Sequence, residues 1–199
     1  MGLIQTLAPT AEPVTLAEAK NHLRVDDDLV DDDALIGILI ATARRYGEML
    51  TGRSWITQKW RLQLDAFYSG GDMGAVIELD KGIVQSVDSI TYLDMSSTQQ
   101  TMDLTQLAQD LVSMPARISP KFGTVWPIAL PQIGAVQINY TAGYGATEAA
   151  IPEGIRQWVL LRLTSLYEHR GEAEVVSRGK LEPLPWVDGL LDPYKVLTL

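Results

Sequence analysis

Six carboxylates lie close together near the start of the chain, in Asp26-Asp27-Asp28 and Asp31-Asp32-Asp33. Clustered carboxylates are typical ligands of Ca²⁺ or Mg²⁺. Counted from Asp26, however, the sixth position is Asp31 where an EF-hand loop needs glycine, and the twelfth is Gly37 where it needs glutamate. The spacing therefore excludes an EF-hand and favours an acidic turn that leads into a helix, because carboxylates stabilise a helix N-terminus.

Two other groups of residues were candidates for chemistry. Gly143-Tyr144-Gly145 stands between an expected strand and an expected helix, but a dinucleotide-binding turn needs a third glycine where this chain has Glu148. A simple glycine turn is the preferred interpretation. The two histidines, His22 and His169, have no metal-ligand spacing, and no G-x-S-x-G elbow supports a serine nucleophile. The sequence thus predicts no catalytic residue, no cofactor and no metal site.

Composition narrows the class of protein further. The 199 residues carry a net charge of -9 and no cysteine, which excludes disulfides, thiolate zinc sites and a thiol nucleophile. The acidity is spread along the whole chain and argues against a grip on nucleic acid, which needs concentrated lysine and arginine. No apolar run approaches the ~20 residues that cross a bilayer. These features indicate an acidic globular protein.

Three helices are expected to position these residues. A capping box at Thr15 and Glu18 opens a short helix that ends near Leu23. Apolar residues at helical spacing predict a long helix from 33 to 51. A third helix starts at Pro152 and Glu153 and runs to about residue 170. Its apolar side chains point in almost every direction, so it needs burial on more than one side.

Between the two long helices the apolar period changes to that of strands. The expected strands are 56–64, 76–79, 87–93, 110–113, 116–119 and 135–142. We therefore predict an α+β fold with two long packed helices plus a short N-terminal helix, and a small β-rich module inserted between the long helices. The corresponding domains are residues 1–54, the β-rich residues 55–146, and residues 147–199.

The end of the chain is more apolar than a terminal segment needs to be. Its large side chains are Leu184, Trp186, Leu190, Leu191 and Tyr194. They must be buried either on their own domain or on a partner, and the sequence leaves both alternatives open.

The order of several motifs resembles that of tailed-phage (siphophage or prophage) head–tail connector proteins. The opening is Pro13-Val14-Thr15-Leu16-Ala17-Glu18-Ala19-Lys20-x-x-Leu23-Arg24-Val25, followed by the acidic run. Five further motifs follow in the order found in that family. They are Leu50-Thr51-Gly52-Arg53, the strand 56–64, the stretch 140–145, Ile151-Pro152 and the ending Leu190-Leu191-Asp192-Pro193-Tyr194-Lys195. The chain departs from the smallest, mainly helical members by inserting residues 55–146, and it has Lys195 where arginine is common.

The resemblance implies a structural virion protein without catalytic activity. Such a protein forms an oligomeric ring beneath the portal, extends the DNA channel and joins head to tail. The implied partners are further copies of the chain, the portal protein and tail-side neck proteins, with DNA passing through without specific binding and no membrane involved. The implied location is the virion neck, and the bacterial cytoplasm during assembly.

On this basis two sets of residues become candidates. The candidate oligomer or portal interface consists of Trp158, Leu161, Leu184, Trp186, Leu190, Leu191 and Tyr194. Asp26, Asp27 and Asp28 are candidates for facing the channel, where negative charge would repel DNA phosphates and let the duplex slide. The alternatives are another neck or tail-completion protein, a small metal-dependent hydrolase that uses the acidic run, and a module that binds peptides through exposed β edges.

Overall fold

The computed structural model describes residues 2–67, 76–168 and 185–196. The chain forms two compact units. The β unit consists of Met1–Thr10, Gly52–Tyr144 and Val196–Leu199, and the helical unit consists of Ala11–Thr51 and Gly145–Lys195. The chain therefore enters and leaves each unit more than once.

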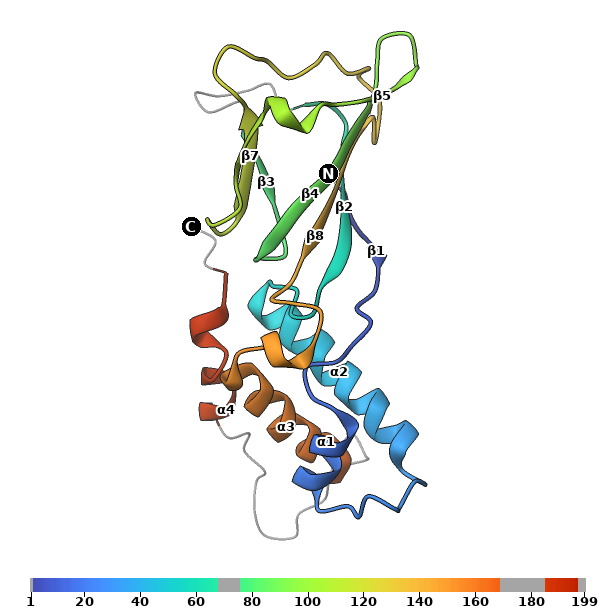
Figure 1. Ribbon diagram of the computed structural model, residues 1–199, viewed down its shortest axis with the longest axis vertical. Coiled ribbons are helices and arrows are strands. Elements are labelled where there is room, and N and C mark those ends of the chain that lie inside the picture. The colour runs from blue at the N-terminus through green and yellow to red at the C-terminus, as the bar shows by residue number, and fades with distance from the viewer. Residues whose placement is uncertain (1, 68–75, 169–184, 197–199) are drawn as a thin grey trace. The chain divides into compact units, whose positions relative to one another are not determined.

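The β unit contains two antiparallel sheets (Figure 1). The five-stranded sheet has the order β1 (Gly2–Leu7), β2 (Gln58–Leu64), β8 (Val136–Ala142), β4 (Val84–Leu93) and β5 (Gln99–Thr101). The three-stranded sheet has the order β3 (Ile77–Leu79), β7 (Ala116–Pro120) and β6 (Leu107–Asp110).

The two sheets share one hydrophobic core. Leu62 and Ile138 of the larger sheet and Leu79 and Ile118 of the smaller one belong to the same buried cluster. Alternate residues of β8 face this core, as the two-residue period of a strand requires. Register shifts in β4 interrupt the alternation, so that its buried residues no longer follow a period of two.

The helical unit contains α1 (Leu16–Leu23), α2 (Asp33–Thr51), α3 (Glu153–Glu168) and α4 (Pro185–Gly189). The capping box is present as expected, since Thr15 accepts from the Glu18 backbone and the Glu18 carboxylate accepts from the Thr15 backbone. α3 contacts α1, α2 and α4. These three neighbours explain why its apolar side chains point in several directions. Short 3₁₀ turns lie at Leu104–Gln106, Glu148–Ala150 and Asp192–Tyr194.

The predicted arrangement of two long helices around a small inserted β module is wrong, although the α+β class is compatible with the structure. In the described residues there are four helices, and eight strands form two sheets. Moreover, β1 precedes every helix and pairs antiparallel with β2, with Gly2 opposite Gln63. The β structure is therefore not one insertion between helices. The sequence did not reveal β1 because only Leu3 packs against the core, which leaves no alternating pattern, and because its partner strand is distant in sequence.

Five of the six strand predictions were accurate to within a few residues. β2, β3, β4, β7 and β8 lie within a few residues of their expected positions. The strand expected at 110–113 is displaced to β6, because the chain needs residues 111–115 to turn into β7. β5 was not expected, since all three of its residues are polar and exposed.

Candidate functional site

The acidic stretch after α1 folds around a buried lysine. The ammonium of Lys20 lies 2.9 Å from the carbonyl oxygen of Asp27, 2.8 Å from that of Leu29 and 2.9 Å from the carboxylate of Asp33. Lys20 is only 3% exposed. Two of the three ammonium donors therefore bond backbone carbonyls, and the carboxylate of Asp33 pairs with the charge. The lysine thus supplies inside the turn the positive charge that a bound cation would otherwise provide.

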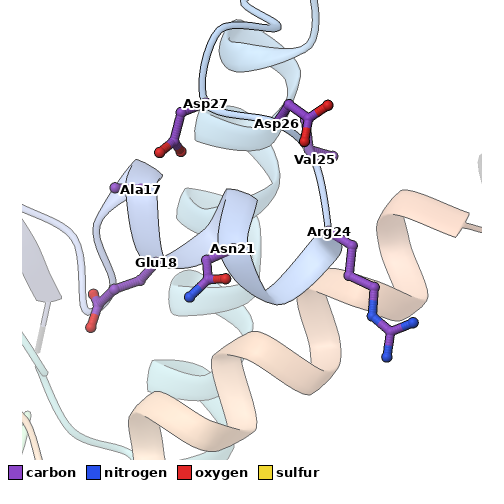
Figure 2. Close-up of a pocket in the computed structure, with 7 residues that line it drawn as sticks. All are labelled: Ala17, Glu18, Asn21, Arg24, Val25, Asp26 and Asp27. Atoms are coloured by element: carbon purple, nitrogen blue, oxygen red, sulfur yellow. The ribbon is translucent and has the colours of Figure 1, made fainter.

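Asp26, Asp27 and Asp28 are all exposed in this turn. Asp26 and Asp27 line an open pocket beside α1, together with Ala17, Glu18, Asn21, Arg24 and Val25. Figure 2 shows that the carboxylates of Asp26 and Asp27 point away from each other. Within the part of the chain that the structure describes, no three acidic, histidine or cysteine side chains form a group that could hold a metal ion. The turn is therefore a negatively charged surface held in a defined shape.

The second half of the acidic run contributes to the packing of the helices. Asp33 begins α2, where its charge meets the positive end of the helix dipole. The Asp32 carboxylate accepts a hydrogen bond from the hydroxyl of Tyr167 on α3. These two carboxylates tie the turn to the helices on either side of it.

Arg44 on α2 forms a buried ion network that the sequence did not predict. Although it is charged, this residue is only 5% exposed. Its Nε lies 2.7 Å from Glu12 and its Nη1 lies 2.9 Å from Glu48. Burial lowers the pKa of Arg44, but the two carboxylates outweigh this effect and raise it above its ordinary value. The spacing of Arg44 and Glu48 by four residues was the one available signal.

The C-terminal segment packs on its own helical unit through Trp158. This tryptophan is fully buried, its ring stacks on Tyr46 with 6.1 Å between centroids, and its Nε1 donates to Asp188 of α4 over 3.0 Å. Leu191 is also fully buried. Tyr194 packs closely on Gly154 at the start of α3, because a Cβ on that glycine would lie 3.0 Å from the tyrosine hydroxyl.

The other candidate interface residues are less enclosed. Leu161, Leu190 and Tyr194 are half-buried. Trp186 lies in α4, while Leu184 and His169 lie outside the described residues. The structure thus brings Trp158, α4 and Tyr194 together in one region of the helical unit. Whether this region also binds a partner stays a prediction.

Close packing explains the glycines of the stretch 143–145. Gly143 has a φ of +139°, and a Cβ there would lie 2.7 Å from backbone atoms of Ile56 and Thr57. A Cβ on Gly145 would lie 2.4 Å from that of Ala150. Both glycines are therefore needed for the approach of neighbouring chain segments.

A feature that sequence reasoning missed is an apolar loop, residues 121–135, between β7 and β8. Phe122, Val125, Ile128 and Ile133 are exposed by 108%, 82%, 77% and 89%. Pro127 and Pro131 argue against a helix in this segment, but they do not indicate whether its apolar side chains are exposed. The uninterrupted absence of charge from 122 to 147 was the signal that would have drawn attention to it. Among the described helices, none combines the length and the hydropathy of a membrane span.

These features are surfaces rather than a reaction centre: a shaped acidic turn, a docked C-terminal helix and an exposed apolar loop. An exposed apolar surface of this kind is typical of proteins that bind other macromolecules. Residues 13–118, more than half of the chain, match the family of phage gp6-like head–tail connector proteins, and the chain belongs to that family. The resemblance seen in the sequence motifs is thus confirmed, and the protein is a structural head–tail connector.

Solved structures share the fold over the full length of the chain. The neck of an empty gene transfer agent (GTA) particle, computed with C6 symmetry, contains a chain that matches with a TM-score of 0.83 and 24% identity, over 100% of this chain and 97% of the other. A native GTA particle and its neck, the latter computed with C12 symmetry, give TM-scores of 0.79 and 0.76 at the same identity and coverage. A comparison with curated proteins finds no match.

Proposed function

We propose that this connector assembles into a closed ring of identical copies in the neck of a phage or prophage virion. The observation that carries the proposal is the match to the connector family, together with a fold shared over the whole chain with chains in GTA neck structures that were computed with C6 and C12 symmetry. A closed ring requires each copy to present two different, complementary surfaces. The acidic turn, the α4 region and the apolar loop offer several distinct surfaces for such contacts.

In this proposal the portal protein binds on the head side of the ring, and tail-side neck proteins bind on the other. The candidate contact region is that of α4, where Leu161, Leu190 and Tyr194 keep part of their surface exposed. Trp158 and Leu191, which are fully buried, hold this region in place rather than touch a partner. The chain performs no catalytic step, and it is made in the bacterial cytoplasm before it joins the particle.

The acidic turn is the candidate surface of the DNA channel. Asp26, Asp27 and Asp28 are exposed, and Lys20 fixes the backbone that carries them. Repeated around a ring, these carboxylates would form a band of negative charge. Such a band repels DNA phosphates and lets the duplex pass without adhering.

The test is to purify the chain alone and with the portal protein encoded beside it, and to measure mass by light scattering and shape by negative-stain electron microscopy. We expect rings, either from the chain alone at high concentration or on the portal. A chain that stays monomeric under both conditions and does not bind the portal would contradict the proposal.

A further inference from the structure

The apolar loop exposes more large hydrophobic surface than folding requires. Its four outward side chains, Phe122, Val125, Ile128 and Ile133, are each more than three-quarters exposed. Isolated exposed hydrophobic residues are common, but several on one short loop mark an interaction site or a risk of aggregation. Figure 1 shows this segment, in olive to gold, crossing the end of the β unit from β7 to β8.

The loop is held in a fixed position by contacts on its inner side. The backbone nitrogen of Lys121 donates to the Gln106 carbonyl over 2.9 Å, and that of Leu130 donates to the Leu93 carbonyl over 2.8 Å. The backbone nitrogen of Gly134 donates to the carboxylate of Asp65 over 2.9 Å.

Aromatic packing adds to this anchoring. Trp126 stacks on the buried Phe67 with 4.9 Å between ring centroids and 10° between planes. Trp126 and Ala129 pack against the core of the β unit. The loop is therefore divided into inward anchors and outward apolar side chains, so its exposed face is presented without a large ordering cost on binding.

The charge distribution indicates what covers this face. The chain has a net charge of -9, yet no charged residue occurs between Lys121 and Glu148. A surface that binds a differently charged partner gains from complementary charges around its apolar centre. The loop carries no carboxylate of its own to attract such a partner, and the Asp65 carboxylate beside it accepts a hydrogen bond from the Gly134 backbone. Two copies of the same acidic chain, in contrast, repel each other least where their surfaces are uncharged.

We infer that the apolar loop is the contact surface between neighbouring copies of this chain. The inference rests on the proposed ring and names one of its two complementary surfaces. A ring contact is heterologous, so the loop of one copy packs on a different surface of the next copy. Repeating this contact by rotation closes the ring.

The test compares two highly exposed valines that lie on either side of β7 in the sequence. Val125 lies in the apolar loop after β7, whereas Val112, which is 89% exposed, lies in the turn between β6 and β7. We expect Val125→Ser, and more strongly Val125→Ser/Ile133→Ser, to weaken self-association by about tenfold or more, measured by light scattering over a concentration series. Val112→Ser should associate like the wild type. Unchanged melting temperatures would show that all variants fold.

A second measurement uses the absence of cysteine from the chain. Val125→Cys and Val112→Cys each carry a single thiol, and maleimide should label both quickly in dilute monomer. In the assembled state we expect protection of Val125→Cys but not of Val112→Cys. Equal labelling of both positions in the assembly would overturn the inference.

The outcomes separate this inference from the proposed function. If the loop variants form normal rings but no longer bind the portal or a tail-side protein, the loop serves that other partner, and the inference is wrong while the neck function stands. If the wild type neither associates nor binds the portal, both proposals fail.

Discussion

Replacing Arg44 by methionine tests a buried charge of the helical unit that two carboxylates share. The aliphatic stem of the side chain is retained, while Glu12 and Glu48 lose their common partner. Removing one member of a buried ion pair costs about 3–5 kcal/mol, because it leaves an uncompensated charge. Here the two carboxylates are 30% and 14% exposed, so water recovers part of their solvation. We therefore expect a loss of about 2–3 kcal/mol in the free energy of unfolding.

The assay is urea denaturation followed by the helical circular dichroism signal. Arg45→Met is the matched control, since Arg45 is the next residue on α2 and is exposed. It should change stability by no more than about 0.5 kcal/mol. The neutral triple variant Glu12→Gln/Arg44→Met/Glu48→Gln should recover part of the loss. A loss below about 1 kcal/mol for Arg44→Met, or no recovery in the triple variant, would refute the electrostatic argument.

Three further predictions concern other parts of the chain. Burial raises the pKa of Asp88, but hydrogen bonds from Ser86 and Thr141 and the ammonium of Lys59 outweigh it and hold the pKa below its ordinary value. The resulting stabilisation is present above about pH 4 and is lost as pH falls through the folded-state pKa of Asp88. Asp88→Asn should therefore destabilise the protein at neutral pH and much less in acid. The midpoints of urea denaturation at the two pH values would measure this difference. Gly143→Ala should cost about 2–3 kcal/mol, because the new Cβ meets backbone at 2.7 Å. Gly37→Ala, whose Cβ would meet nothing within 4 Å, should instead stabilise α2 by up to ~1 kcal/mol, and equal thermal shifts for the two variants would contradict the packing argument. Finally, Asp26→Lys/Asp28→Lys should make assembled rings retain duplex DNA in a salt-dependent binding assay, whereas Glu78→Lys/Asp80→Lys, with the same charge change on β3 and the residue after it, should not.

The helices could be predicted because their signals are local. The capping box at Thr15 sets the first residue of α1, and the acidic start at Asp33 sets that of α2. Each signal lies within a few positions of the helix start that it determines. β1 could not be predicted in this way, since its pairing with β2 depends on residues more than fifty positions away. A strand whose side chains are mostly exposed has no pattern of its own to reveal it.

The residues of the candidate site could likewise be predicted only where their signal is local in the sequence. Acidic residues are conspicuous in a sequence, so the turn at Asp26–Asp28 was found, but the lysine at its centre was not. Burial of Lys20 and Arg44 follows from the three-dimensional path of the chain around them. The exposure of Phe122 and Ile133 is likewise a property of the fold, because apolar residues between prolines look the same whether they are inside or outside.

The ammonium of Lys20 has a consequence for how the particle would respond to its surroundings. Its positive charge is covalently part of the chain and cannot be removed by dialysis or a chelator. The shape of the acidic turn should therefore be the same in water poor in calcium and magnesium as in water rich in them. A virion that leaves one host and drifts through media of very different mineral content would carry this part of its neck unchanged.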